Sequence, residues 1–299
     1  MNTGYRFIQY LVQILLRTFF RTVKLSGLEN IPSDRGGLLI SWHPNGMIDP
    51  ALIFSSFPKA IVFGARHGLF SWPLLGRLMK MIGTVPIYRG KDTRSWSIDE
   101  QRSKNQQSLE AMASAINEGA FAALFPEGIS HDSPFVQTFK TGAARIFYQA
   151  LEQSTDRIPV IIPVGLHYDR KQGFRSNVLV HFHPPIELSE ELVCVPTKEE
   201  QARQWRSLTD TMEETLTTVV FSLESWELHQ NVHCAAQLIG AERRKRAGSS
   251  QGIPMEERVL GVSRIWHAYQ QKKDQFPEKT EQLLESLSEY RNDLDALGV

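Results

Sequence analysis

The chain has 299 residues, with 33 basic and 33 acidic side chains, so no net charge points to a nucleic-acid partner. Hydrophobic residues make up 41% and charged residues 22%, proportions typical of a globular protein with a substantial core. The two cysteines are too few for a disulfide framework or a cysteine-based metal site, and they favour a reduced, cytoplasmic compartment.

Residues 1–24 are rich in apolar and aromatic side chains and carry a few charges. Those charged residues are all basic: Arg6, Arg17, Arg21 and Lys24. The longest uncharged run, Phe7 to Leu16, is about half of the ~20 residues that a membrane-spanning helix needs. No small-residue cleavage site follows it, as a secretory signal would require. The pattern fits an amphipathic helix at a membrane interface, although a helix packed on the protein core has the same periodicity.

After this helix, short β-type runs alternate with helical ones. Strands are predicted at "TVKLSG", "GGLLISW", "KAIVFGA", "TVPIYR", "AFAALF", "IPVIIPVGLHY" and "NVLVHFH". Helices are predicted at "PALIFSSF", "WPLLGRLMKMIG", Ser97 to Glu118 and "TGAARIFYQALEQ". This alternation predicts an α/β domain with a mostly parallel central sheet flanked by helices. Ligands of such folds bind at the carboxyl ends of the strands.

From about Thr197 the strand signals stop and long polar helical segments follow. They are predicted at 198–229, 232–246, 255–272 and 277–295, with a linker-like stretch at 247–254. We therefore divide the chain into an amphipathic helix (1–24), an α/β domain (25–195) and a C-terminal helical extension (196–299).

The stretch "SWHPNGMIDP" leaves the second predicted strand and contains a histidine and an aspartate. A histidine near its unperturbed pKa can accept a proton from an alcohol, and a carboxylate can fix its tautomer. Pro44 and Gly46 favour a turn that lets Asp49 fold back onto His43. Asp49 also precedes Pro50, a sequence typical of a helix N-cap. The two interpretations are compatible, because a capping aspartate is rigidly held.

Two further clusters follow predicted strands, and Lys140 and Pro163 are single candidates. Arg89 leaves "TVPIYR" just before a polar loop, where a guanidinium could grip a phosphate or simply be solvated. Glu127 and Gly128 lie in "FPEGIS" after "AFAALF", which is either a ligand-facing loop or a common turn. Lys140 precedes "TGAAR", where it could hold an anion beside a helix N-terminus. Pro163 lies inside "VIIPVGL" and indicates a sheet edge or an irregularity.

Other catalytic arrangements receive less support. Ser130, His131 and Asp132 are consecutive, so their side chains diverge and cannot form a triad, and no G-x-S-x-G elbow occurs. His167, His181 and His183 could ligate a metal, but three histidines without a carboxylate at a known spacing are more often structural. We predict no metal site.

The order and spacing of these clusters carry more information than each cluster alone. His43 with Asp49, "GTVPIYR", "FPEGIS" and "VIIPVGL" together resemble the four ordered blocks of the glycerolipid (PlsC-like) acyltransferase family. The resemblance covers about residues 25–190, and "FPEG" is its most specific part. The helical segment ending in "ESWE" is similar to extensions of a glycerol-3-phosphate acyltransferase-like branch.

The resemblance implies a role for each residue. His43 would be the general base that deprotonates a glycerol hydroxyl as it attacks an acyl thioester, with Asp49 orienting it. Arg89 would hold the phosphate of the acceptor, Glu127 and Gly128 would shape its pocket, and Pro163 would position the acyl-binding region. The mechanism would need no metal and no cofactor, with acyl-CoA or an acyl carrier protein supplying the acyl group.

Two departures from the family pattern bear on the acceptor. Asp49 follows His43 by six residues, whereas the family usually has five. The longer form, with "HPN" and a following "DP", resembles a branch of the family. The third block ends in Ile129 and Ser130 where the family usually has Thr-Arg, and Lys140 is the candidate replacement for the missing cation.

The predicted function is therefore transfer of a fatty acyl group to glycerol 3-phosphate or 1-acylglycerol 3-phosphate in phospholipid biosynthesis. We expect a peripheral or monotopic protein on the cytoplasmic face of a membrane, in contact with anionic lipid. Two alternatives stay open: an acyltransferase for another lysophospholipid or alcohol, and a non-catalytic lipid-binding peripheral protein.

Overall fold

The computed structural model describes residues 3–89, 96–154, 157–248 and 252–297. Its contacts divide the chain into two compact units. The first comprises Met1–His131 and Gln137–Val219, and the second comprises Asp132–Val136 and Val220–Val299. The catalytic candidates His43 and Asp49 lie in the first unit.

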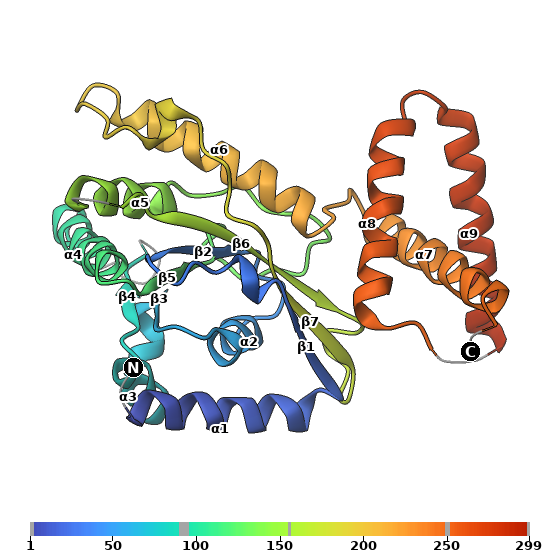
Figure 1. The fold of residues 1–299 in the computed structure, drawn as a ribbon, viewed down its shortest axis with the longest axis horizontal. Coiled ribbons are helices and arrows are strands. Elements are labelled where there is room, and N and C mark those ends of the chain that lie inside the picture. Colours follow the sequence, from blue (N-terminus) through green and yellow to red (C-terminus); the bar gives the residue numbers. More distant parts are fainter. Residues whose placement is uncertain (1–2, 90–95, 155–156, 249–251, 298–299) are drawn as a thin grey trace. The chain divides into compact units, whose positions relative to one another are not determined.

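A central sheet organises the first unit. Within the described part of the chain its seven strands lie in the order β1-β7-β6-β2-β5-β3-β4 (Figure 1). Their bounds are β1 Thr22–Ser26, β2 Gly37–Ser41, β3 Ile61–Arg66, β4 Val85–Ile87, β5 Phe121–Leu124, β6 Val160–Tyr168 and β7 Asn177–Phe182. Strands β6 and β7 pair antiparallel, whereas the other pairs are parallel. The predicted α/β class with a mostly parallel sheet is confirmed.

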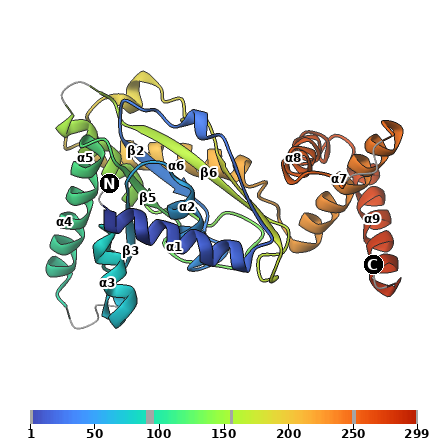
Figure 2. The same cartoon turned by 60° about the horizontal axis from the view of Figure 1, so that its bottom comes forward.

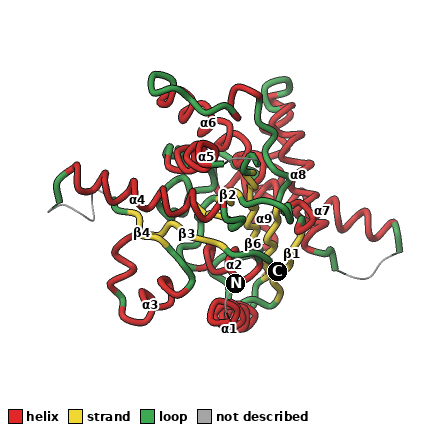
Figure 3. Tube along the Cα trace, turned by 60° about the vertical axis from the view of Figure 1, so that its left-hand side comes forward, coloured by secondary structure: helices red, strands yellow, loops and turns green. Residues whose placement is uncertain are grey.

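Helices cover both faces of this sheet. They are α1 Thr3–Phe19, α2 Ile48–Ser56, α3 Pro73–Met81, α4 Ile98–Asn117, α5 Gly142–Gln153 and α6 Gln201–Val219, with short 3-10 turns at Leu28–Asn30, His67–Ser71 and Glu190–Val193. Helices α4, α5 and α6 lie over one face, and α1 and α2 lie over the other, with α1 against α2 (Figures 1 and 2). Figure 3 shows β4 at the edge of the sheet beside α4.

Strand β2 lies at the centre of the sheet and is buried along its whole length. Leu38, Leu39 and Ile40 are at most 1% exposed, as expected for a parallel strand covered on both faces. Gly37 begins the strand between Phe121 and Val160, and a Cβ there would overlap the carbonyl oxygen of Val160. The glycine pair before "LLIS" therefore lets three strands approach closely at their start.

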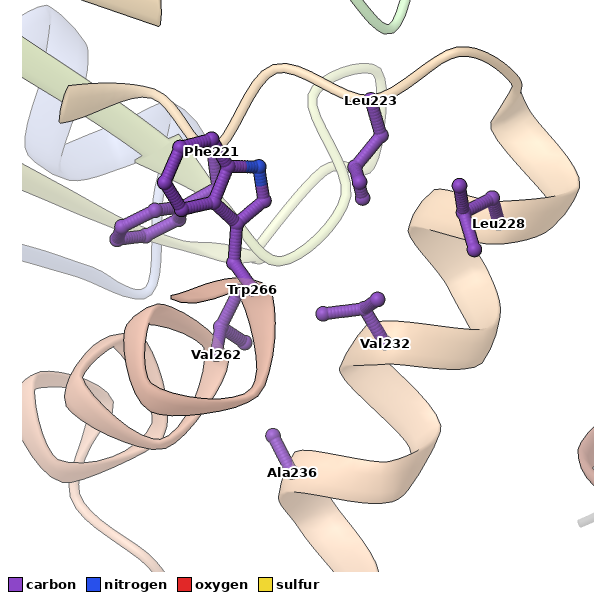
Figure 4. Packing of buried hydrophobic residues seen from close by; sticks show 7 residues of the cluster. All are labelled: Phe221, Leu223, Leu228, Val232, Ala236, Val262 and Trp266. Carbon is purple, nitrogen blue, oxygen red and sulfur yellow. The ribbon is translucent and has the colours of Figure 1, made fainter. Parts of the chain in front are cut away.

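The second unit has a hydrophobic core of its own. It contains α7 Trp226–Arg246, α8 Met255–Lys272 and α9 Pro277–Leu297. Figure 4 shows apolar side chains of α7 directed toward α8 and toward the segment that precedes α7. This core cluster consists of Phe221, Leu223, Leu228, Val232, Ala236, Val262 and Trp266. All its members lie between residues 221 and 266, so segments that are close in sequence form this core.

The chain departs from the predicted helical pattern near Phe221. A single segment was expected over 198–229, but α6 ends at Val219 and α7 begins at Trp226. Phe221 has a positive φ of 55°, and the Ser225 side chain accepts a hydrogen bond from the Leu228 N–H as an N-cap. Both features stop and restart the helix.

The contact units also divide the chain later than predicted. Helix α6 packs on β6 and α5 and belongs to the first unit, whereas the predicted boundary lay at residues 195–196. In the predicted linker 247–254, residues 249–251 lie outside the described residues. Among the described helices, none combines the length and the apolar character needed to cross a bilayer.

Candidate active site

Candidate catalytic and binding residues from three loops lie at the carboxyl edge of the sheet. His43 follows β2, Glu127 follows β5, and Arg89 follows β4. These strands run parallel, so their carboxyl ends meet at one edge, where α/β folds bind ligands. The topology therefore explains why these three residues come together, although 38 to 84 sequence positions separate them.

His43 and Asp49 form a close pair. The Nδ1 atom of His43 lies 2.9 Å from Oδ2 of Asp49, and the aspartate side chain is fully buried. A carboxylate accepts, so Nδ1 carries the proton and Nε2 keeps its lone pair. Among the described residues, Nε2 of His43 has no hydrogen-bond partner, and the side chain is 17% exposed. The ring therefore presents a basic nitrogen to incoming molecules.

The extra residue between His43 and Asp49 is accommodated by a turn. Gly46 has a φ of +40°, and the backbone N–H of Asn45 donates to Oδ2 of Asp49 at 2.7 Å. Helix α2 begins at Ile48, so Asp49 lies in its first turn and is not the N-cap that the sequence predicted. A negative charge there still interacts favourably with the helix dipole.

Two aromatic residues complete the surroundings of this pair. The ring of Phe125 stacks on the imidazole of His43, with centroids 4.0 Å apart and planes 13° apart. The hydroxyl of Tyr168, the last residue of β6, donates to Oδ1 of Asp49. Burial, together with the charge of Asp49, raises the pKa of Tyr168 well above its usual value, so the hydroxyl stays protonated.

Glu127 lies beneath the loops rather than at their surface. Its carboxylate is fully enclosed and accepts from the backbone N–H of His43 at 3.0 Å, from Nε2 of His131 at 2.8 Å and from the backbone N–H of Gln137 at 2.8 Å. Three donors occupy the two oxygens, which compensates the burial of the charge. Glu127 therefore ties the His43 loop to the loop after β5.

Two cations border Gly128. Nη1 of Arg89 donates to the Gly128 carbonyl at 3.0 Å. Gly128 has a φ of +71°, and a Cβ on it would lie 2.5 Å from Nζ of Lys140. The positive φ favours glycine at this position, and the missing side chain leaves room for Nζ of Lys140. The exposed Lys140 and the half-buried Arg89 converge on one loop.

Pro163 lies within strand β6 and not in the loops at the carboxyl edge. It pairs in register with Ile40 of β2, and its carbonyl accepts from the His183 N–H at 2.9 Å on the β7 side. The expectation of a sheet edge is wrong, because β6 lies between β2 and β7. The proline carbonyl still joins the hydrogen bonding of the sheet, although its nitrogen has no N–H to donate.

The histidines that were weighed as metal ligands lie on neighbouring strands. His181 and His183 are on β7, with ring centroids 4.1 Å apart, and Nε2 of His167 lies close to Gly165 of β6. In the described part of the chain, no group of three or more metal-ligating side chains has a geometry that could hold an ion.

Sequence reasoning missed the residues that hold the pair in place. Tyr168 is 119 residues from Asp49, and His131, which contacts Glu127, was considered only as part of a failed triad. The signal for Tyr168 was its position at the end of "VIIPVGLHY", since that end of a parallel strand faces the site.

The fold and this site define an α/β protein with a histidine–carboxylate pair at the carboxyl edge of its sheet. Residues 22–167 match the sequence model of the family described as Acyltransferase, a span that includes His43, Asp49, Arg89 and Glu127. This part of the chain, just under half of its length, is similar to the acyltransferase family. The resemblance read from the four sequence blocks is confirmed.

Curated relatives cover parts of the chain. A chloroplastic 1-acyl-sn-glycerol-3-phosphate acyltransferase of Arabidopsis thaliana is 29% identical over 58% of this chain and 47% of its own length. Glycerol-3-phosphate O-acyltransferase 1 of Saccharomyces cerevisiae is 32% identical over 35% of this chain and 14% of its own length. A lyso-ornithine lipid O-acyltransferase of Rhodobacter capsulatus is 31% identical over 44% of this chain and 52% of its own length. The chain spans about half of these relatives or less.

Among solved structures, the 1-acyl-sn-glycerophosphate acyltransferase PlsC of Thermotoga maritima superposes with a TM-score of 0.47 and 18% identity. The superposition covers 71% of this chain and 79% of that chain.

Proposed function

We propose that this chain is an O-acyltransferase that moves a fatty acyl group from a thioester to glycerol 3-phosphate or 1-acylglycerol 3-phosphate. The observation that carries the proposal is the His43–Asp49 pair, in which Nδ1 binds a buried carboxylate and Nε2 has no hydrogen-bond partner among the described residues. The family match of residues 22–167 and the activities named for the relatives support the same reaction class.

The chemistry follows from the orientation of the imidazole. Nε2 of His43 takes the hydroxyl proton of the acceptor while the oxygen attacks the thioester carbonyl carbon. The C–O bond forms, the C–S bond breaks, and the leaving thiolate takes the proton back from Nε2. Asp49 stabilises the imidazolium between these transfers. The thioester is already activated, so this scheme contains no covalent acyl-enzyme, no metal and no cofactor.

The acceptor phosphate is assigned to the cations beside Gly128. Arg89 and Lys140 approach this residue from two elements, and a guanidinium with an ammonium suits a phosphate dianion. Glu127 shapes this pocket indirectly, because its own oxygens are occupied by internal donors. Pro163 would act on the acyl side through the position of β6, which remains a prediction from the resemblance.

A donor-by-acceptor matrix tests the function. Purified protein is incubated with labelled acyl-CoA or acyl carrier protein and with glycerol 3-phosphate, 1-acylglycerol 3-phosphate or lyso-ornithine lipid, with His43→Ala as the control. We expect transfer to a glycerol-phosphate acceptor that His43→Ala abolishes. Transfer confined to lyso-ornithine lipid would replace the proposed acceptor, and lipid binding without transfer from any donor would favour the non-catalytic alternative.

We further propose that α1 docks on the cytoplasmic face of a membrane. One face of α1 packs on the protein: Tyr5 and Ile8 are buried, and the Gln9 side chain donates to the Phe54 and Phe57 carbonyls at 2.9 Å. Five other apolar side chains of α1 are exposed: Phe7, Tyr10, Leu11, Ile14 and Leu15. Both interpretations of the amphipathic pattern are therefore supported, each by a different face.

Helix α3 contacts α1 and also exposes apolar side chains. Trp72, at the start of α3, is 58% exposed, and Leu74 is 73% exposed. Exposed aromatic and aliphatic residues together with Arg6 and Arg17 suit an interface of acyl chains and anionic headgroups. A peripheral or monotopic attachment would place the site where lysophospholipid acceptors partition.

The double variant Phe7→Gln/Leu15→Gln tests the attachment. Deleting α1 would also remove its packing residues, whereas these two side chains are 66% and 61% exposed. We expect co-sedimentation with vesicles of phosphatidylcholine and phosphatidylglycerol to weaken about tenfold or more, because apolar area leaves the bilayer. Leu260→Gln, at a 57% exposed position of α8, is the control. Equal sedimentation of the double variant and the wild type would contradict the proposal.

A further inference from the structure

The carboxylate of Asp49 is held from two sides. Oδ2 accepts from Nδ1 of His43 at 2.9 Å and from the Asn45 N–H at 2.7 Å, both in its own turn. Oδ1 accepts from the hydroxyl of Tyr168, the last residue of β6, which is the strand beside β2. The terminal torsion of an aspartate is broad and roughly two-fold, so the local contacts alone leave the plane of the carboxylate poorly fixed.

Tyr168 is itself firmly placed. It ends β6 in register with Val178 of β7, and the next residue, Asp169, donates its N–H to the Asn177 carbonyl at 3.0 Å. Its ring lies 6.0 Å from the ring of the fully buried Phe20. The phenol therefore approaches Asp49 from a strand rather than from a loop, which gives its hydroxyl a well-defined position.

The segment after Tyr168 also reaches the histidine turn. Nδ2 of Asn45 donates to the Lys171 carbonyl at 2.8 Å, and Nζ of Lys171 lies 3.4 Å from the Pro44 carbonyl. Residues 168–171 thus contact both the turn that follows His43 and the aspartate that orients it. The longer His43–Asp49 spacing is accompanied by this external support.

We propose that Tyr168 is a positioning residue that fixes the plane of the Asp49 carboxylate and, through it, the orientation of the His43 imidazole. It touches no reacting atom and acts through Asp49. The inference rests on the proposed function only for its kinetic consequence, because the orientation of His43 is a property of the free protein. Hydrogen bonds around a histidine–carboxylate pair set the tautomer and direction of the ring.

Tyr168→Phe tests the proposal, because it removes one oxygen and keeps the ring. We expect kcat to fall about ten- to a hundredfold with KM unchanged, since a misdirected base affects the chemical step rather than binding. In an Asp49→Asn background the same substitution should change kcat less than twofold, because two residues that act as a unit are not additive. Equal factors in both backgrounds would contradict the proposal.

Tyr148→Phe is the matched control. Tyr148 is 4% exposed on α5, and its hydroxyl has no hydrogen-bond partner among the described residues. Its removal should leave kcat unchanged. A loss of kcat equal to that of Tyr168→Phe would indicate a general effect of removing a buried phenol and would overturn the assignment.

A spectroscopic arm separates this proposal from the proposed function. In protein labelled with 15N-histidine, the imidazole signal of His43 is identified by its absence in His43→Ala. Tyr168→Phe should shift that signal and Tyr148→Phe should not. A shift in a protein that transfers no acyl group would retain the positioning role and reject the proposed activity, whereas an unchanged signal would reject the positioning role.

Discussion

Two histidine–carboxylate pairs lie within this site, and they differ in how the imidazole is used. His43 binds Asp49 through Nδ1 at 2.9 Å, whereas His131 binds Glu127 through Nε2 at 2.8 Å. Both carboxylates are fully buried, but the His43 side chain is 17% exposed and the His131 side chain 8%. A short contact and a buried carboxylate therefore do not distinguish a candidate base from a structural histidine.

The ring nitrogen that the carboxylate binds does distinguish them. In the first pair the carboxylate takes Nδ1 and leaves Nε2, the outer nitrogen, available for an acceptor hydroxyl. In the second pair the carboxylate takes Nε2, the nitrogen farthest from the backbone, and Glu127 also accepts two backbone N–H groups. The first pair is arranged for proton transfer, and the second holds two loops together.

Glu127→Ala would disrupt the second pair, and of the stability changes predicted here it should have the largest effect on the free energy of unfolding. It leaves the His43 N–H, His131 Nε2 and the Gln137 N–H without their acceptor. Removing one member of a buried pair costs about 3 kcal/mol or more, so we expect the free energy of unfolding to fall by about that amount. Urea unfolding measures it.

Glu118→Gln is the control for this change. Glu118 is an exposed residue at the end of α4, so its substitution should alter the free energy of unfolding by less than about 0.5 kcal/mol. If Glu127→Ala were as stable as this control, Glu127 would not be the structural anchor described here.

A histidine without a carboxylate sharpens the comparison further. Burial, reinforced by the neighbouring His181, lowers the pKa of His183 to about 3, and its Nε2 has no hydrogen-bond partner among the described residues. The unfolded chain protonates this histidine near pH 6.5 while the folded chain does not. Stability from this group is therefore complete above about pH 6.5 and declines as the pH falls toward 3.

His183→Gln should remove that dependence. Between pH 6 and 5 the wild type should lose up to about 1.4 kcal/mol more than the variant in the free energy of unfolding. The histidines of α7 share this behaviour, since burial lowers the pKa of His229 to about 4 and of His233 to about 3, so the difference between the two proteins is the informative quantity. Parallel pH curves would show that His183 does not titrate in this way.

Sequence patterns predicted the first unit well where the signal was local. The strands and helices around "GGLLISW", "AFAALF" and Ser97 follow from apolar runs, periodicity and an N-cap, and the structure places them as expected. The break between α6 and α7 was misplaced because it depends on the positive φ of Phe221, a conformation that bulky residues rarely adopt and that no local pattern indicates.

The site was predicted in its residue types but not in its connections. His43 and Asp49 lie in one turn, so their pairing could be foreseen. Tyr168 reaches Asp49 only because β6 lies beside β2, a pairing that sequence order alone does not give. Glu127 was predicted to face a ligand or to belong to a common turn, yet its carboxylate is buried and accepts from His43, His131 and Gln137. Long-range pairing is what the local pattern could not encode.

The most direct test of the account compares the two histidines in one acyl-transfer assay with a labelled thioester and a glycerol-phosphate acceptor. His43→Ala should lower kcat about 1,000-fold, because a general base contributes roughly 10²–10⁴-fold. His131→Ala should retain kcat within about tenfold of the wild type once corrected for its folded fraction, because its imidazole supports a loop. Full activity of His43→Ala, or an equal loss in both variants, would contradict the assignment of His43 as the base.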